Sequence, residues 1–227
     1  MSSAASAGKG LPRAVEAAAA AACLAAAAPF LLLAAAAIVA TTGDSPLFRQ
    51  RRVGRNGRLF RLVKLRTMRK TAGAEVTAGG DERVTRVGRL LRRTKVDELP
   101  ELWNILRGDM AWVGPRPEVP RYVDGEDPRW RGVLAARPGL TDPVTLRLRN
   151  EEELLAGIAG DREAFYRDHL QPWKLRGYAD YLARRTWRTD LTVLRDTVRA
   201  VLRPGTAPPP TVDDVLAEGL QTRRFER

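Results

Sequence analysis

The feature that most constrains this chain is an uninterrupted apolar segment near its N-terminus. From Ala17 to Ala40, 24 consecutive residues carry no polar side chain. As a straight helix rising ~1.5 Å per residue, the segment would extend about 36 Å, which is enough to cross the hydrocarbon core of a bilayer. It is mostly alanine, so it inserts less strongly than a leucine-rich helix. The segment predicts a membrane helix, preceded by a flexible head over residues 1–13.

Three interpretations compete for the apolar segment. A secretory signal peptide is disfavoured, because the stretch exceeds the usual ~7–15 residues and no clear Ala-x-Ala exit follows it. A kinked helix that spans the membrane is the simplest alternative, since Pro29 near the centre removes a helix hydrogen bond. The third is a re-entrant helix that enters and leaves on one face. Basic residues flank both ends, so the positive-inside rule gives little reason to place them on opposite sides. We expect a re-entrant helix over residues 14–43.

The charge of the chain indicates an anionic partner. It has 39 Lys and Arg against 27 Asp and Glu, a net charge of +12. Nucleic acid, an anionic membrane surface and phosphorylated small molecules all suit such a charge. The single cysteine, Cys23, lies in the apolar segment, which excludes disulfides and a cysteine zinc site. His169 is the only histidine, so in an enzyme carboxylates and arginines would carry the chemistry.

Residues 44–202 are predicted to form an α+β domain that is mostly helical. RLFRLVKL at 58–65 alternates as a strand does, after a turn predicted around Gly54, Asn56 and Gly57. Helical patterns cover 83–95, 151–166 and 178–202. The last is amphipathic and suits either the core or a membrane interface; its apolar stripe consists of Trp187, Leu191, Leu194, Val198 and Val201. Residues 203–227 are expected to be a Pro-rich linker and a short C-terminal helix.

The candidate chemistry lies between Leu91 and Pro117, LRRTKVDELPELWNILRGDMAWVGPRP. Thr94 and Asp97 have the spacing of a helix capping box, and Pro100 is tolerated only near a helix start. The helix dipole and nearby cations would keep Asp97 and Glu98 ionised. One carboxylate could attack phosphorus while the other binds Mg²⁺, which prefers oxygen ligands. The simpler hypothesis is that both acids only cap the helix.

Arg116 stands out among the many arginines. It lies between Pro115 and Pro117, which restrict the backbone and preset the direction of a planar, bidentate phosphate ligand. A charged side chain that needed only solvent would have no use for this rigidity. The motif therefore favours a phosphate-binding role for Arg116.

In these motifs the chain resembles the bacterial sugar transferase family, the monotopic phosphoglycosyl transferases that start glycan assembly on polyprenol phosphate. SPLFRQRRVGRNGRLFRLVKLRTM at 45–68 is similar to the basic motif that opens the family's catalytic domain. DERVTRVGRLLRRTKVDELPELWNILRGDMAWVGPRP at 81–117 resembles the catalytic core, and RPGLT at 137–141 the turn that follows. The resemblance extends from about Arg13 to Leu202 and is to the family's minimal members. The family breaks its membrane helix at a Ser-Pro pair, where this chain has Ala28 and Pro29.

The resemblance implies a two-step transfer. Asp97 would attack the sugar-linked phosphate of a nucleoside diphosphate sugar, expected to be a UDP-sugar, and the covalent phosphosugar would pass to polyprenol (undecaprenyl) phosphate. Glu98 would bind Mg²⁺ together with Asp97 or assist the acceptor. Further substrate-binding roles are implied for Arg92 and Arg116 with Pro115, and for Lys64 and Arg66 of the basic motif.

The resemblance also implies a bacterial inner-membrane protein whose catalytic domain lies on the cytoplasmic face and initiates exopolysaccharide or other glycoconjugate synthesis. Membrane lipids and downstream glycosyltransferases would be its neighbours. A different hypothesis is a catalytically silent membrane adaptor that binds anionic lipid. A nucleic-acid-binding protein is disfavoured, because the apolar segment and the Asp-Glu pair would have no role in one.

Overall fold

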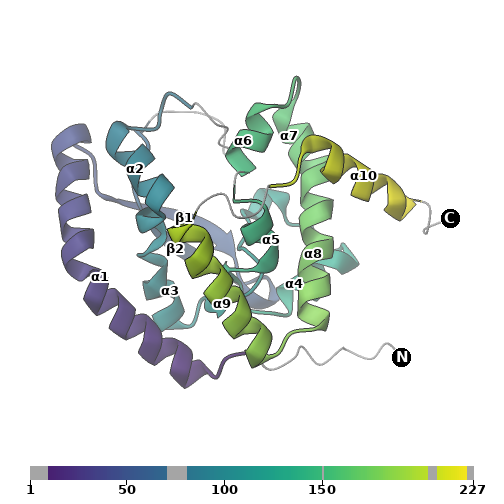
Figure 1. Ribbon diagram of the computed structural model, residues 1–227, viewed down its shortest axis with the longest axis horizontal. Helices are drawn as coiled ribbons and strands as arrows, with labels where there is room; N and C mark the ends of the chain where they lie inside the picture. The colour runs from purple at the N-terminus through teal and green to yellow at the C-terminus, as the bar shows by residue number, and fades with distance from the viewer. Residues whose placement is uncertain (1–9, 71–80, 150, 204–208, 224–227) are drawn as a thin grey trace.

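The computed structural model describes residues 10–70, 81–149, 151–203 and 209–223, with side chains up to residue 217. One long helix lies along the side of a mostly helical body that contains two small sheets (Figure 1). The predicted α+β class is confirmed. Most of the expected N-terminal head, residues 71–80 and most of the linker after residue 203 lie outside the described residues.

The apolar segment forms one helix, α1 (Arg13–Thr42), which ends at Gly43 in the left-handed conformation. Pro29 lies inside it, and Figure 1 shows α1 bending near its middle, as a missing helix hydrogen bond allows. Ala20 in the first half packs with residues of the helix α3 (Glu101–Arg107), and Ile38 in the second half packs with Leu65. The helix is long and apolar enough to cross a membrane. Both of its halves nevertheless contact the same body.

The predicted strand is confirmed as part of a hairpin. β1 (Leu47–Val53) pairs antiparallel with β2 (Leu59–Leu65) over their whole length. A short 3-10 turn, η1 (Arg55–Gly57), joins them, with Asn56 at φ 56° and Gly57 at φ 75°. Asparagine and glycine tolerate this left-handed backbone better than other residues do, which explains the turn sequence. The hairpin buries Leu62 and Leu65 and brings Lys64 toward the site.

A second, two-stranded sheet joins β3 (Ala111–Val113) and β4 (Gly139–Thr141) in parallel. The connection between them contains the 3-10 turn η3 (Pro120–Tyr122) and the helix α4 (Pro128–Leu134). Gly139 crosses Gly114 so closely that a Cβ on Gly139 would lie 2.1 Å from the Gly114 nitrogen. Any side chain there would push the two segments apart, so the glycine of the RPGLT motif is required by packing.

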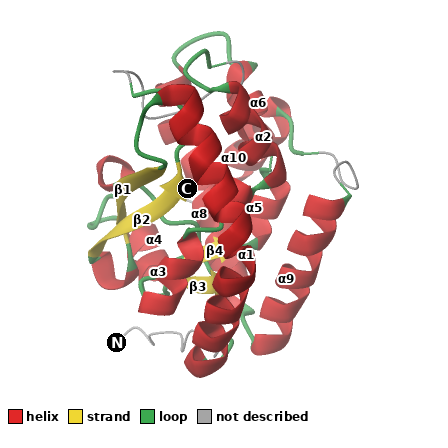
Figure 2. Cartoon of the chain, turned by 90° about the vertical axis from the view of Figure 1, so that its left-hand side faces the viewer, coloured by secondary structure: helices red, strands yellow, loops and turns green. Residues whose placement is uncertain are grey.

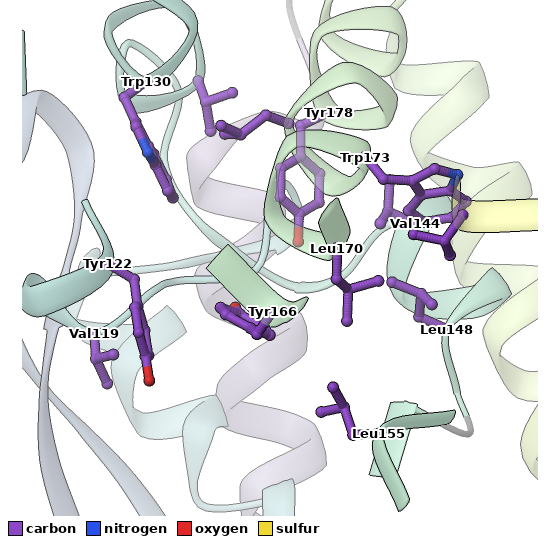
Figure 3. Close-up of a cluster of buried hydrophobic side chains, with 13 residues drawn as sticks. Val119, Tyr122, Trp130, Val144, Leu148, Leu155, Tyr166, Leu170, Trp173 and Tyr178 are labelled. Atoms are coloured by element: carbon purple, nitrogen blue, oxygen red, sulfur yellow. The ribbon is translucent and has the colours of Figure 1, made fainter. Parts of the chain in front are cut away.

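The largest hydrophobic cluster among the described residues consists mainly of side chains from the C-terminal helices (Figure 3). These are α5 (Pro143–Arg147), α6 (Glu151–Ala156), α7 (Arg162–Phe165), the π-helical turn η4 (Tyr166–Leu170), α8 (Gln171–Ala183) and α10 (Val212–Arg223). The single helix predicted over 151–166 is therefore wrong. It breaks after Ala156, because Gly157 and Gly160 disfavour helix and Asp161 starts a new one by capping α7.

The amphipathic pattern at 178–202 divides between α8 and α9 (Trp187–Leu202), which begins with a capping box at Thr186. Asp190 and Val193 form the buried side of α9. The stripe that we expected to face either the core or a membrane is largely exposed: Trp187 is 49% and Val198 57% accessible. The core interpretation is wrong for this stripe, apart from the partly buried Leu194. Figure 2 shows α9 at the edge of the body.

Candidate active site

The loop that carries Asp97 and Glu98 connects two helices. α2 (Arg86–Thr94) confirms the helix predicted over 83–95, and Lys95 ends it in a left-handed conformation at φ 58°. Asp97 and Glu98 then lie in the 3-10 turn η2 (Val96–Glu98), before α3 (Glu101–Arg107). The predicted capping box is wrong. The Thr94 hydroxyl donates to the carbonyl oxygen of Leu90 at 2.9 Å, because Thr94 belongs to the last turn of α2 and not to the start of α3.

Asp97 is held in an environment that suits a nucleophile. It is 7% exposed, and its Oδ1 atom is buried without a hydrogen-bond donor among the described residues. Burial raises the pKa of Asp97, and the negative charge of Glu98 adds to this, while the charge of Lys64 opposes it. A carboxylate that is poorly solvated and lies next to fixed cations is typical of a reactive site.

Glu98 is bound by two cations from distant parts of the chain. Its Oε1 atom lies 3.0 Å from the Nζ atom of Lys64 on β2 and 2.6 Å from the Nη2 atom of Arg116 after β3. Burial works against the ionised form of Glu98, but the charges of Arg116 and Lys64 outweigh it and hold its pKa well below the ordinary value. The structure thus brings together four predicted site residues, Asp97, Glu98, Lys64 and Arg116.

A third carboxylate, which the sequence analysis missed, belongs to the same cluster. Glu101 is 1% exposed, and its Oε1 atom lies 3.1 Å from Lys64 Nζ. One turn later the buried Asn104 accepts from the Val63 nitrogen and donates to the Arg61 carbonyl oxygen. α3 therefore fixes both the backbone of β2 and the direction of Lys64. The sequence signal that could have pointed to Glu101 is its spacing from Asn104: the two polar residues are three positions apart and therefore lie on one side of α3.

Arg92 approaches from α2. Its Nε atom donates to Thr67 Oγ1 at 2.9 Å, and its Nη1 atom donates to Glu152 Oε1 on α6 at 2.6 Å. The charge of Arg92 also helps to lower the pKa of Asp97, against the larger effect of burial. Arg92 thus lies on the same side of the body as the candidate nucleophile.

The two remaining predicted site residues, Arg66 and Pro115, make hydrogen bonds with backbone atoms and not with the acidic residues of the site. The guanidinium of Arg66 donates to the carbonyl oxygens of Ser45 and Leu47, at 2.7 and 3.3 Å, so it stabilises the approach to β1. The carbonyl oxygen of Pro115 accepts from the Gly139 nitrogen at 3.0 Å, which fixes the segment that carries Arg116. A direct role of Arg66 or Pro115 in substrate binding stays a prediction.

The site is tied to α1 by a buried acid. Glu16 is 1% exposed, and its Oε2 atom lies 2.9 Å from Arg137 Nη2. The Oε1 atom of Glu16 accepts from the Trp112 backbone nitrogen at 3.3 Å, and the indole of Trp112 donates to the Glu16 carbonyl oxygen at 3.0 Å. The membrane helix is thereby bound to β3 and to the RPGLT segment, which position Arg116.

Comparison with known proteins identifies the family of this chain. The family model described as bacterial sugar transferase matches residues 8–204. The chain belongs to the bacterial sugar transferase family.

Several curated proteins are similar to this chain. A UDP-glucose:undecaprenyl-phosphate glucose-1-phosphate transferase from Caulobacter vibrioides is 41% identical over 163 residues, which cover 69% of this chain and 56% of that protein. An undecaprenyl-phosphate galactose phosphotransferase from Salmonella typhimurium is 30% identical over 183 residues, covering 71% and 34%. The exopolysaccharide production protein ExoY of Rhizobium meliloti is 35% identical over 152 residues, covering 59% and 65%. The chain spans less than two thirds of the length of these relatives.

The resemblance to the bacterial sugar transferases implies Mg²⁺, and the residues present fit that ion. Among the described residues there is no group of three or more His, Cys, Asp or Glu side chains that would enclose a metal. Mg²⁺ does not need one, since it often uses one or two carboxylates together with waters and substrate phosphates. The unbonded Oδ1 of Asp97 is a suitable donor. Glu98 is less free, because its Oε1 is already paired with Lys64 and Arg116.

Proposed function

We propose that this family member transfers a sugar phosphate from a nucleoside diphosphate sugar, expected to be a UDP-sugar, to polyprenol phosphate, with Asp97 as the nucleophile. The observation that carries the proposal is the pairing of a buried, unbonded Asp97 oxygen with an adjacent Glu98 that is fixed by two cations. A carboxylate that only capped a helix would instead accept hydrogen bonds from backbone nitrogens. The names of the relatives support the same activity.

The first step is a displacement at the phosphorus that carries the sugar. A carboxylate oxygen of Asp97 forms a bond to this phosphorus, and the bond to the bridging oxygen breaks. The nucleoside monophosphate leaves with the electron pair, and no proton has to move. Charge spreads over the phosphoryl oxygens in such a transition state, so Arg116 and Arg92 would stabilise it. Splitting the transfer into two displacements is the advantage of a covalent intermediate.

In the second step the phosphate of the lipid carrier attacks the aspartyl phosphosugar. A phosphate oxygen of the carrier bonds to the phosphorus, and Asp97 leaves as a carboxylate, which yields a polyprenol diphosphosugar. Glu98 remains ionised because Arg116 and Lys64 hold its pKa down. Its role is to position these two cations beside the reacting phosphate throughout both steps.

Asp97, with Glu98, would hold Mg²⁺ in the loaded enzyme. The ion would supply positive charge against the donor diphosphate, which lowers the repulsion between that diphosphate and the two carboxylates. Lys64 and Arg116 offset the charge of Glu98, whereas no ion pair of Asp97 is present among the described residues.

We further propose that α1 is re-entrant and that the catalytic body lies on the cytoplasmic face of the bacterial inner membrane. Both halves of α1 pack on the same body, through Ala20 and Ile38. The middle of α1, in contrast, presents Phe30, Leu32 and Leu33 at exposures of 63 to 71%. A bent helix that dips into the lipid and returns accounts for both observations, and a straight span would carry one half away from the body.

The experiment is release of nucleoside monophosphate from a panel of nucleotide sugars, using detergent-purified protein, Mg²⁺ and polyprenol phosphate. With the correct donor we expect release to need the lipid for turnover and to be lost in Asp97→Asn. Asp180→Asn is the matched control, because Asp180 is an exposed aspartate without a side-chain partner among the described residues. Without lipid, labelled sugar phosphate should remain on the wild-type protein at no more than one equivalent.

The alternative, a silent adaptor, predicts a different result. Equal release by Asp97→Asn and wild type would exclude Asp97 as the nucleophile. Binding to anionic vesicles without turnover of any donor would favour the adaptor.

A further inference from the structure

α6 brings an acidic side chain to the edge of the candidate site from about 60 positions along the chain. Leu155 anchors this helix in the large hydrophobic cluster (Figure 3), where it is 1% exposed. Two neighbouring glutamates of α6 differ in their surroundings. Glu152 is paired with Arg92, whereas Glu153 is exposed and has no ion pair among the described residues. The contact with Arg92 is therefore specific to one position of the helix.

The contact uses the edge of Arg92 that faces solvent. The Nε atom of Arg92 is already bound to Thr67 on the inner side, at 2.9 Å. The outer Nη1 atom donates to Glu152 at 2.6 Å, with the Arg92 side chain 23% and the Glu152 side chain 48% exposed. Arginine binds carboxylates and phosphates through the same N–H donors. Glu152 thus occupies the outer donor of Arg92, which a phosphate would also use.

α6 does not depend on this contact for its position. Leu155 fixes the helix from below, and Glu151 binds Lys174 Nζ at 3.0 Å. A half-exposed ion pair such as that of Glu152 is weak and is screened by salt. A diphosphate brings more negative charge to the same donors, so it can displace the glutamate.

We propose that Glu152 competes with the diphosphate of the donor for Arg92. In the free protein Glu152 holds the arginine, and donor binding replaces the carboxylate with a phosphate. Glu152 therefore weakens donor binding and favours release of the nucleotide product. The inference rests on the proposed function for the identity of the donor. The competition itself is a property of Arg92 and any diphosphate.

The test measures binding of inorganic pyrophosphate by titration calorimetry to the full chain in detergent. We expect Glu152→Gln to tighten binding about two- to fivefold, the effect of removing one exposed ion pair. Glu153→Gln makes the same change of charge on the same helix, and its affinity should equal that of the wild type. In an Arg92→Gln background, Glu152→Gln should have no effect, because the two residues act through one contact. In turnover, Glu152→Gln should lower the KM for the donor.

Three results would overturn the inference: unchanged or weaker binding in Glu152→Gln, an equal gain in Glu153→Gln, or a gain that persists without Arg92. Failure of the proposed function is distinguishable from these outcomes. If no donor is turned over but Glu152→Gln still tightens pyrophosphate binding through Arg92, the competition stands and the transferase proposal fails. If a donor is turned over but Glu152→Gln leaves pyrophosphate binding unchanged, the transferase proposal stands and the competition fails.

Discussion

Glu16 and Arg137 form an ion pair of 2.9 Å across the junction between the membrane helix and the catalytic body. Their side chains are 1% and 25% exposed. Removing one member leaves a buried charge without its partner, which usually destabilises a protein more than the intact pair stabilises it. The pair therefore links the integrity of the site to the docking of α1.

Glu16→Gln is expected to lower the stability of the protein by about 2–4 kcal/mol, because Arg137 loses its counter-charge. The measurement is the thermal unfolding of the purified protein in detergent. Glu126→Gln, at an exposed position of a turn, should change the stability by less than about 0.5 kcal/mol. A double variant, Glu16→Gln with Arg137→Met, should recover part of the loss. An unfolding temperature of Glu16→Gln equal to that of the wild type would show that the pair contributes nothing.

Arg116→Lys keeps the positive charge next to Glu98 but removes the planar pair of donors. Under the proposed mechanism we expect turnover to fall about 10- to 100-fold, and about 100- to 1000-fold in Arg116→Ala. Arg131→Lys, on the exposed side of α4, should keep the wild-type rate. The variants are compared by initial rates of nucleoside monophosphate release. A full rate in Arg116→Lys would mean that charge alone is sufficient there.

Gly139→Ala tests the close crossing of β3 and β4. The added Cβ would lie 2.1 Å from the Gly114 nitrogen, so the strands must separate, and we expect a loss of at least about 2 kcal/mol. Gly132→Ala makes the same change inside α4, where no atom lies within 4 Å of the new Cβ. It should stabilise the helix by about 0.5–1 kcal/mol. Unfolding curves of the two variants should shift in opposite directions, and equal shifts would contradict the packing argument.

The re-entrant topology is tested by labelling single cysteines in a Cys23→Ser background. Ala5→Cys lies before α1 and Ser45→Cys after it. An impermeant maleimide should label both in inverted membrane vesicles and neither in intact spheroplasts. Labelling of the two positions from opposite sides would establish a spanning helix and exclude the re-entrant form.

Local patterns predicted the elements whose form is decided locally. The long apolar helix, the hairpin with its Asn-Gly turn and the helix α2 each follow from composition or spacing within a few turns of chain. The proximity of Asp97, Glu98 and Arg116 could also be expected, because the resemblance placed them in one motif. Their roles remain predictions of that resemblance.

Contacts between distant residues could not be predicted in the same way. Glu152 reaches Arg92 across 60 positions, and Glu16 reaches Arg137 across an even longer separation. Both acids lie in helices that the local sequence pattern explains without those contacts. Thr94 shows the opposite error, since its spacing to Asp97 fits a capping box while the preceding helix continues through it. Only the packing of α2 decides which helix the threonine belongs to.

The two-sided attachment of α1 has a consequence for how the protein responds to its surroundings. Ala20 and Ile38 are parts of two separate core clusters, yet the helix between them is embedded in lipid under the proposed topology. A bilayer that is thicker, thinner or under tension changes how deeply the bend settles, and so pulls on both clusters at once. We therefore expect the packing around the loop between α2 and α3 to depend on lipid composition. Reconstitution into bilayers of graded acyl-chain length would show whether the activity of the site changes with bilayer thickness.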